Sequence, residues 1–177
     1  MSASRDVLER ARAVKLAVFD VDGVMTDGRL YFTENGETMK VFHTLDGHGL
    51  RMLQQAGIEI AIISGRASAA LTRRARDLDI THVFQGIDDK LKAFEALYSG
   101  MKLTLEEIAG IGDDLVDLPI LTRCGFSACV PGAPAAVRER VHHVTTAPGG
   151  GGAVREFCEI ILAAQGKLDG LLKRYLA

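Results

Sequence analysis

The stretch that decides the fold is LAVFDVDGVMTDG, residues 16–28. Its first four residues are apolar and stop at the polar segment 20–23, which predicts a buried strand that ends in a loop. In open α/β sheets, ligands bind just beyond the carboxyl ends of the parallel strands. Asp20 and Asp22 are therefore the first candidate functional residues of the chain.

Short apolar segments alternate with helical segments along the rest of the chain. We expect further strands at 58–64, 82–84, 108–111, 126–130 and 141–144, separated by helices of about ten residues. Strands that alternate with helices predict a parallel sheet covered on both faces. The predicted fold class is therefore α/β, with a doubly wound, Rossmann-like sheet.

One insertion interrupts this alternation. Two alternating segments at 29–32 and 38–42 flank Glu34-Asn35-Gly36, and Asn-Gly between such segments is a strong hairpin signal. We therefore predict a β-hairpin insertion over residues 29–42. Only 38 positions separate Thr26 from Ser64, and 26 separate Ser64 from Lys90. Because predicted elements fill both intervals, we expect no cap domain.

Length and composition indicate one domain spanning residues 1–177, with a C-terminal helix or tail at 166–177. Of the 177 residues, 47% are apolar and 25% are charged, which is typical of a chain that folds around one core. The net charge of −2 provides no general attraction for nucleic acid or for an anionic membrane. No long apolar run, signal peptide or CxxC pair is present in the sequence, so we expect a cytoplasmic location.

Polar residues follow three of the predicted strands, at the same edge of the sheet. They are Asp20 and Asp22 after the first strand, Ser64 and Arg66 after the second, Asp113 and Asp114 after a later one, and Lys90 at the start of a helix between them. Clustered carboxylates repel one another unless a cation neutralises them, and all-oxygen ligands favour Mg²⁺. The hydroxyl and the basic side chains suit a phosphoryl group. The pattern predicts magnesium-assisted phosphoryl transfer.

In these motifs the chain resembles the haloacid dehalogenase superfamily of phosphohydrolases. The motifs occur in that superfamily's order: DVDGVMTDG at 20–28, Ser64, Lys90 and GDDLVDLP at 112–119. Two longer stretches, 40–66 and 149–167, are similar to the superfamily branch of 3-deoxy-D-manno-octulosonate (KDO) 8-phosphate phosphatases. The resemblance implies a phosphomonoester hydrolase that releases the free sugar acid and inorganic phosphate in lipopolysaccharide precursor biosynthesis.

The resemblance also implies a role for the residues of each motif. Asp20 would be the nucleophile that forms an aspartyl phosphate, a case of covalent catalysis. Asp22 would be the acid/base that protonates the leaving alkoxide and then activates water. Ser64 would donate a hydrogen bond to a phosphoryl oxygen, and Lys90 would offset the charge on Asp20 and on the phosphate.

A magnesium ion is the cofactor that the resemblance implies. Asp20, the backbone carbonyl of Asp22 and Asp113 would bind it, with Asp114 or Asp117 in a supporting position.

For the sugar acid, the resemblance places one loop and several basic side chains at the pocket. The expected substrate contacts are His43, Thr44, Leu45, Asp46, Gly47, Arg51, Arg66 and Arg74, together with Asp22 and Lys90. Arg66 stands two residues from Ser64, whereas Arg51 and Arg74 are equally compatible with solvated helix positions. The resembling phosphatases are homotetramers whose hairpins pack together at the pocket entrance, so we expect a homotetramer.

Other functions are compatible with parts of the pattern. A phosphatase acting on a nine-carbon ulosonate phosphate would carry the same motifs. A receiver-type signalling domain is also doubly wound, but receivers are phosphorylated on an aspartate after the third strand, which here ends in Phe84-Gln85-Gly86. A non-catalytic module is a third alternative, against which the intact set of Asp20, Asp22, Lys90 and Asp113 argues.

The glycine run at 149–152 matches neither the phosphate-loop pattern nor GxGxxG. We interpret it as a turn into the following helix, with a substrate contact as the alternative.

Overall fold

The centre of the molecule is a six-stranded parallel sheet with the strand order β5-β4-β1-β6-β7-β8. We describe it from a computed structural model of residues 3–176, without the side chains of Glu37 and Thr38. The strands are β1 (Leu16–Phe19), β4 (Glu59–Ile63), β5 (His82–Phe84), β6 (Ile108–Gly112), β7 (Phe126–Cys129) and β8 (His143–Val144). Numbered along the chain within this sheet, the order is 3-2-1-4-5-6, which is a doubly wound arrangement. The predicted fold class is confirmed.

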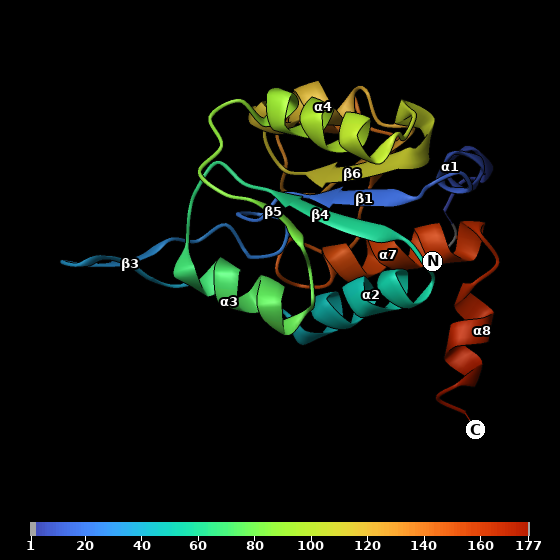
Figure 1. Ribbon diagram of the computed structural model, residues 1–177, viewed down its shortest axis with the longest axis horizontal. Helices are drawn as coiled ribbons and strands as arrows, with labels where there is room; N and C mark the ends of the chain where they lie inside the picture. Colours follow the sequence, from blue (N-terminus) through green and yellow to red (C-terminus); the bar gives the residue numbers. More distant parts are fainter. Residues whose placement is uncertain (1–2, 177) are drawn as a thin grey trace.

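Helices cover both faces of the sheet (Figure 1). One face carries α1 (Arg5–Ala11), α2 (Thr44–Gln55), α3 (Ala69–Asp77) and α7 (Ala153–Ala164), and the other carries α4 (Lys90–Met101) and α5 (Leu118–Leu121). The shorter elements are η1 (Leu105–Glu107), η2 (Leu115–Asp117), α6 (Ala135–Arg138) and α8 (Leu168–Lys173).

Strand β1 is buried on both of its faces. Leu16 and Val18 belong to the smaller core beneath α4, whereas Phe19 belongs to the larger core. In that larger core the rings of Phe19 and Phe157 meet edge to face at 5.6 Å. Successive strand residues point to opposite faces, and here both faces are covered, which explains the continuous apolar run at 16–19.

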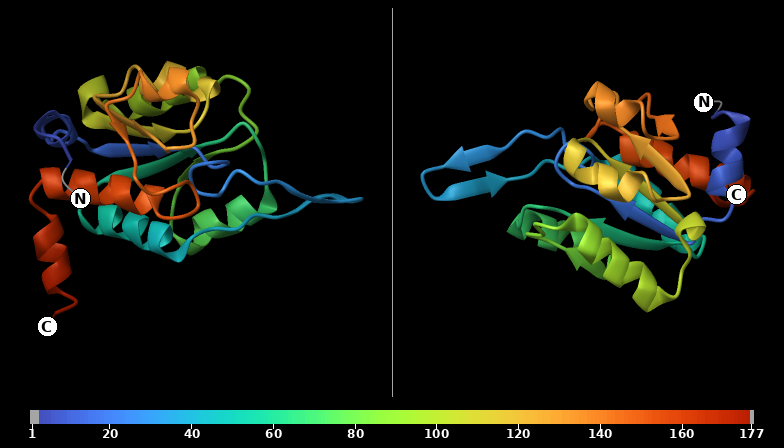
Figure 2. Two further views of the ribbon diagram at one scale, coloured as in Figure 1. Left: turned by 180° about the vertical axis from the view of Figure 1, so that it is seen from behind. Right: turned by 90° about the horizontal axis from the view of Figure 1, so that it is seen from above.

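The predicted hairpin consists of β2 (Tyr31–Thr33) and β3 (Gly36–Met39) and projects away from the sheet (Figures 1 and 2). Gly36 has φ +102°, a backbone conformation that glycine adopts without steric cost. Four large apolar side chains on and beside the hairpin are 41–59% exposed: Leu30, Phe32, Met39 and Val41. The hairpin therefore presents an apolar surface that the described part of the chain does not cover.

Helix α2 departs from its predicted boundaries. It begins at Thr44 rather than at the predicted 49, because Gly47 and Gly49 weaken the helical signal in the sequence. Their small size has a packing role instead: a Cβ on Gly49 would lie 3.1 Å from the Cα of Arg155. Gly49 therefore allows α2 and α7 to pack closely, whereas a Cβ on Gly47 would meet Arg74 of α3.

Two other expectations concern the membrane and the cysteines. Within residues 3–176, no helix has the length and apolar character that crossing a membrane requires. All three cysteines (Cys124, Cys129 and Cys158) are buried and free.

The C-terminal helix α8 leaves the body after α7 (Figure 1). Beyond it, the hydroxyl of Tyr175 lies 2.7 Å from Nε2 of His48, so the C-terminal segment contacts α2 of its own chain.

Candidate active site

The candidate active site lies at the switch point of the sheet. Strand β1 pairs with β4 on one side and with β6 on the other, and the strand order reverses between β1 and β6. A crevice forms beyond the carboxyl ends of strands at such a point. A cavity of about 180 Å³ there is lined by Asp20, Asp22, Ser64, Gly65, Arg66, Lys90, Asp113, Asp114 and Val116. The structure thus brings together the residues that the sequence places at this edge.

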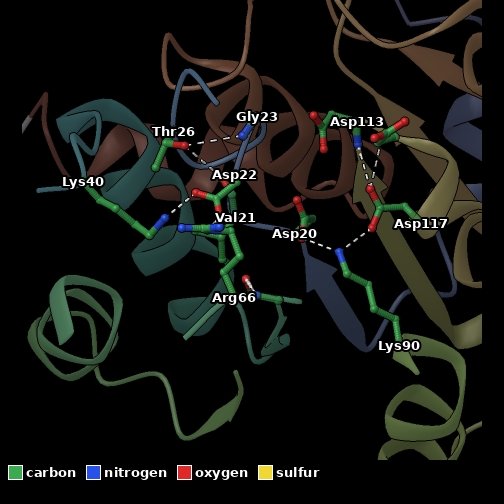
Figure 3. Close-up of polar contacts among 12 residues, drawn as sticks. Asp20, Val21, Asp22, Gly23, Thr26, Lys40, Arg66, Lys90, Asp113 and Asp117 are labelled. Atoms are coloured by element: carbon green, nitrogen blue, oxygen red, sulfur yellow. Dashed lines mark hydrogen bonds and ion pairs between the residues drawn. The ribbon is translucent and has the colours of Figure 1, made fainter. Parts of the chain in front are cut away.

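Lys90 links two buried carboxylates (Figure 3). Its Nζ donates to Asp20 Oδ1 at 2.5 Å and to Asp117 Oδ1 at 2.7 Å, and all three side chains are less than a tenth exposed. Asp89 accepts a hydrogen bond from the backbone N–H of Lys92 and so caps α4 at the turn that carries Lys90. The helix start therefore fixes the ammonium group between the two carboxylates.

The site holds more negative charge than Lys90 balances. Burial, with the charge of Asp117, raises the pKa of Asp20 from 3.8 to about 6. Burial, with the charges of Asp20 and Asp117, raises the pKa of Asp113 from 3.8 to about 7. Burial alone would lower the pKa of Lys90, but the two carboxylates outweigh it and the pKa is raised. A further cation would relieve this excess of negative charge.

Three carboxylates are close enough to share a cation. One oxygen from each of Asp20, Asp113 and Asp117 lies within 4.8 Å of the other two. Asp117, however, uses both of its oxygens within the protein: Oδ1 accepts from Lys90, and Oδ2 accepts from the backbone N–H groups of Asp113 and Asp114 at 3.0 and 3.2 Å. Asp20 and Asp113 are therefore the better placed to bind a cation directly, and Asp117 holds the loop that presents Asp113.

Gly23 allows the first loop to approach Asp113. Its φ is +97°, and a Cβ at this position would lie 2.0 Å from Asp113 Oδ2, so no side chain fits there. The hydroxyl oxygen of Thr26 accepts hydrogen bonds from the backbone N–H groups of Gly23 and Gly28 at 3.4 and 3.2 Å. These bonds close the loop that follows β1 and bring it against the end of β6.

Asp22 extends toward two other cations, Lys40 and Arg66, on the side away from Lys90 (Figure 3). The Nζ of Lys40 donates to Asp22 Oδ1, and Nε of Arg66 lies 3.7 Å from Asp22 Oδ2. Sequence reasoning missed Lys40, because a lysine at the end of a hairpin arm resembles a solvent-exposed edge residue. Its side chain is in fact only 2% exposed.

Ser64 lies at the end of β4 and is 2% exposed. Its backbone N–H donates to Phe84 O at 2.9 Å, which joins it to the neighbouring strand β5. Its Oγ accepts a hydrogen bond from the backbone N–H of Arg66 at 3.3 Å. This turn places the hydroxyl and the Arg66 side chain at the same cavity.

The remaining predicted substrate residues lie outside the cavity. Arg74 donates from Nη2 to His43 O at 3.4 Å, and a Cβ on Gly47 would lie 2.1 Å from the same nitrogen. Buried His43 Nδ1 and Arg74 Nε have no hydrogen-bond partner among the described residues. Thr44 and Leu45 form the first turn of α2 beside them.

Arg51 lies in α2 and pairs with Asp79: its Nη1 is 2.5 Å from Asp79 Oδ2. Within one chain, the structure therefore does not bring Arg51 to the carboxylates.

The loop before α7 is held by two buried acidic residues. Asp46 is 3% exposed and accepts hydrogen bonds from the backbone N–H groups of Arg155 and Gly152 at 2.9 and 3.4 Å, so it caps α7. Glu156 is also 3% exposed and accepts from the backbone N–H groups of Thr146 and Ala147. The carboxylate of Asp46 therefore has a structural role, and its contact with substrate stays a prediction.

The glycine run packs directly against the first loop. Gly150 donates its backbone N–H to Val24 O at 3.0 Å, and a Cβ on Gly149 would lie 1.7 Å from Gly23 O. The run therefore supports the loop that carries Asp20 and Asp22. Sequence reasoning missed this contact, since a run of glycines has no pattern that identifies its neighbour.

Comparison with known proteins identifies the family. The family model described as haloacid dehalogenase-like hydrolase matches residues 83–156. Over 165 residues the chain is 45% identical to the KDO 8-phosphate phosphatase KdsC of Yersinia pestis, which covers 93% of this chain and 88% of the relative. The chain belongs to the KDO 8-phosphate phosphatase family. The Escherichia coli K12 member of that family is 43% identical over 166 residues, or 94% of this chain and 88% of the relative.

Solved structures of KDO 8-phosphate phosphatases share the fold of this chain. The Yersinia pestis crystal structure gives a TM-score of 0.93 at 44% identity and covers 95% of this chain and 91% of that one. The Moraxella catarrhalis structure is a complex with a magnesium ion, a phosphate ion and a KDO molecule. It gives a TM-score of 0.95 at 41% identity and covers 98% of this chain and 99% of that one. The resemblance inferred from the motifs is confirmed.

Membership of the KDO 8-phosphate phosphatase family removes the receiver-type alternative. Receiver sheets have the strand order 2-1-3-4-5, whereas this sheet has the order 3-2-1-4-5-6.

Proposed function

We propose that this chain is a Mg²⁺-dependent phosphatase that hydrolyses KDO 8-phosphate to the free sugar acid and inorganic phosphate, in lipopolysaccharide precursor biosynthesis. The observation that carries the proposal is the convergence of Asp20, Asp22, Lys90 and Asp113 on one small cavity. The relatives support the choice of substrate, since the Yersinia pestis protein is a phosphatase of this ester and the Moraxella catarrhalis structure contains KDO.

The residues of the site fit a magnesium ion. We assign its direct ligands to the carboxylates of Asp20 and Asp113 and to the backbone carbonyl of Asp22, with Asp114 and Asp117 in support. The all-oxygen donor set and the uncompensated negative charge at Asp20 and Asp113 both favour a hard cation. When bound, the ion supplies positive charge for the oxygens of the transferred phosphoryl group.

Asp20 is the nucleophile in this proposal. A bond forms between its carboxylate oxygen and phosphorus as the bond from phosphorus to the sugar oxygen breaks, which gives an aspartyl phosphate. Lys90, 2.5 Å from Asp20 Oδ1, offsets the charge that gathers around the reacting phosphoryl group. The parallel pairing of β1 with both neighbours fixes the strand end that presents Asp20.

Asp22 is the acid/base. As a carboxylic acid it gives its proton to the departing sugar oxygen, and as a carboxylate it then takes a proton from the water that attacks the aspartyl phosphate. Ser64 and Arg66 line the same cavity and provide the hydroxyl and guanidinium donors for phosphoryl oxygens.

The sugar acid carries a carboxylate, which basic side chains would recognise. Arg66 lines the cavity, and two buried nitrogens, His43 Nδ1 and Arg74 Nε, have no hydrogen-bond partner within residues 3–176 as described. We assign the substrate contacts to Arg66, Arg74 and the segment 43–47. Arg51 would reach a substrate only if another subunit brought it there, because in its own chain it pairs with Asp79.

We further propose that the active form is a homotetramer in the cytoplasm. The exposed apolar side chains of the hairpin support assembly, because an isolated hairpin is marginally stable in water and contiguous apolar surface usually marks an interface. The buried free cysteines are compatible with a reducing compartment.

The experiment is a phosphate-release assay with KDO 8-phosphate and Mg²⁺. A nine-carbon ulosonate phosphate and glucose 6-phosphate, which lacks the carboxylate, serve as comparison substrates. We expect the highest kcat/KM for KDO 8-phosphate and the lowest for glucose 6-phosphate. A higher kcat/KM for the nine-carbon acid would transfer the assignment to that substrate, and no release from any ester would overturn the proposed function.

A further inference from the structure

Asp22 is held between two cations that contact different oxygens of its carboxylate. Lys40 donates to Oδ1, whereas Arg66 Nε lies 3.7 Å from Oδ2, beyond hydrogen-bond distance. Oδ2 is buried and has no hydrogen-bond partner among the described residues. The two oxygens are therefore inequivalent: Oδ1 is fixed by an ion pair, whereas Oδ2 has an unused hydrogen-bonding capacity on a carboxylate whose residue lines the cavity.

The hairpin is the element that brings the fixing cation to Asp22. Lys40 directly follows β3, 18 positions after Asp22 along the chain, and its side chain is 2% exposed. On the opposite arm, the ring of Phe32 lies 5.7 Å from the guanidinium carbon of Arg66. One arm of the hairpin thus carries a cation that faces Asp22, and the other arm contacts the second such cation. Figure 3 shows Lys40 and Arg66 beside Asp22, and Figure 2 shows the hairpin outside the main sheet.

A buried lysine is costly unless it is paired, so this pairing is specific rather than incidental. The alternative for a surface hairpin would be a solvent-exposed lysine that protects the sheet edge. The burial of Lys40 argues against that alternative. A general acid needs a defined orientation toward the leaving oxygen, and displacement by about 1 Å can cost about 100-fold in rate.

We propose that Lys40 is a positioning residue that fixes Oδ1 of Asp22, so that Oδ2 faces the leaving oxygen of the substrate. The inference rests on the proposed function, in which Asp22 acts as the acid. The bond from phosphorus to the ester oxygen breaks while Asp20 bonds to phosphorus, and the ester oxygen takes the proton from Asp22 Oδ2. The free alcohol leaves, and Asp22 remains as a carboxylate paired with Lys40.

The test uses the dependence of the rate on the leaving group. In 4-nitrophenyl phosphate the departing phenolate is stable without protonation, whereas the alkoxide from KDO 8-phosphate requires a proton. Because general acid catalysis contributes about 100-fold or more, Lys40→Met should lower kcat/KM for KDO 8-phosphate by about 100-fold. Its kcat/KM for 4-nitrophenyl phosphate should fall by less than about tenfold, since the acid is not needed to expel this leaving group.

Three further variants separate positioning from a general structural effect. Arg29→Met removes an exposed cation just before β2 and should change kcat/KM for both substrates by the same small factor. Lys40→Arg keeps the charge and should recover part of the loss on KDO 8-phosphate. In an Asp22→Asn background, adding Lys40→Met should have little further effect on KDO 8-phosphate, because the acid is already absent.

The outcomes distinguish this inference from the proposed function. If the wild type releases phosphate but Lys40→Met lowers kcat/KM for both esters by the same factor, Lys40 does not act through Asp22. An undiminished effect of Lys40→Met in the Asp22→Asn background would also overturn the inference. If Lys40→Met fails to fold by circular dichroism, Lys40→Gln is measured against the same criteria. A wild type that hydrolyses neither ester contradicts the proposed function instead.

Discussion

Gly149 packs so closely on Gly23 that a Cβ on Gly149 would lie 1.7 Å from the carbonyl oxygen of Gly23. Two loops that are distant in the sequence therefore meet backbone to backbone at the active site. One of them carries Asp20 and Asp22, and the other leads into α7. The contact makes the glycine run a support for the loop that carries Asp20 rather than only a turn.

Gly149→Ala should therefore damage catalysis, because the new methyl group must push the loop that carries Asp20 and Asp22 away from its position. We expect kcat to fall by at least about tenfold, since small displacements of reacting groups are costly. Gly132→Ala is the matched control, because a Cβ there meets nothing within 4 Å and Gly132 lacks a positive φ. Steady-state kinetics on both variants check this prediction, and equal kcat values for the two would contradict it.

Asp46→Ala should destabilise the fold by about 1–3 kcal/mol, because two part-buried backbone N–H groups at the start of α7 lose their acceptor. Equilibrium unfolding in urea measures the free energy of unfolding directly. The control is Asp169→Ala, an exposed carboxylate on α8, which should change stability by less than about 0.5 kcal/mol. A loss for Asp46→Ala no larger than that of the control would show that the cap contributes little.

Removal of magnesium should make stability depend on pH. The pKa values of about 6 for Asp20 and about 7 for Asp113 exceed their unfolded value of 3.8, so the folded chain binds protons more readily than the unfolded chain. Above those pKa values the ionised pair destabilises the metal-free fold, and protonation relieves this as the pH falls. In chelator, the free energy of unfolding should therefore rise from about pH 8 to about pH 5.5.

Magnesium should also raise the Tm more at about pH 8 than at about pH 5.5, because protons compete with the cation for the same carboxylates. Asp113→Asn is the control and should flatten the pH dependence in chelator. Thermal unfolding with and without Mg²⁺ gives both readings. An equal Tm increase at the two pH values would be incompatible with a cation bound by these residues.

The double variant Leu30→Asp with Met39→Asp should produce a species smaller than the proposed tetramer. Both side chains are exposed on the hairpin, and charge there opposes packing between hairpins. These substitutions leave Lys40 in place, whereas deletion of the whole hairpin would also remove the ion pair with Asp22. Sedimentation velocity measures the change in size, and an unaltered sedimentation coefficient would show that assembly does not use the hairpin.

The centre of the sheet could be predicted from the sequence because β1, β6 and β7 are buried along their whole length and read as apolar runs. Residues 16–19 and 82–84 form strands at the predicted positions, and the polar residues after β1, β4 and β6 meet at one cavity. Helix α2 was less predictable, since Gly47 and Gly49 lower helix propensity while Gly49 serves the packing against α7.

Contacts between distant segments could not be read from local patterns. Nothing in the residues around Lys40 indicates that it is buried against Asp22, and nothing in the run 149–152 indicates its contact with Gly23. Likewise, Asp46 lies within a segment predicted to bind substrate, but its carboxylate caps α7. These three features depend on how the chain folds back on itself.

The most direct test of the central claim is inorganic phosphate release from KDO 8-phosphate in the presence of Mg²⁺, compared between the wild type and Asp20→Asn. An amide cannot accept the phosphoryl group, so the variant should lose at least about a thousandfold in kcat while its circular dichroism spectrum stays that of the wild type. A folded Asp20→Asn protein that keeps a tenth of the wild-type kcat would contradict the assignment of Asp20 as the nucleophile.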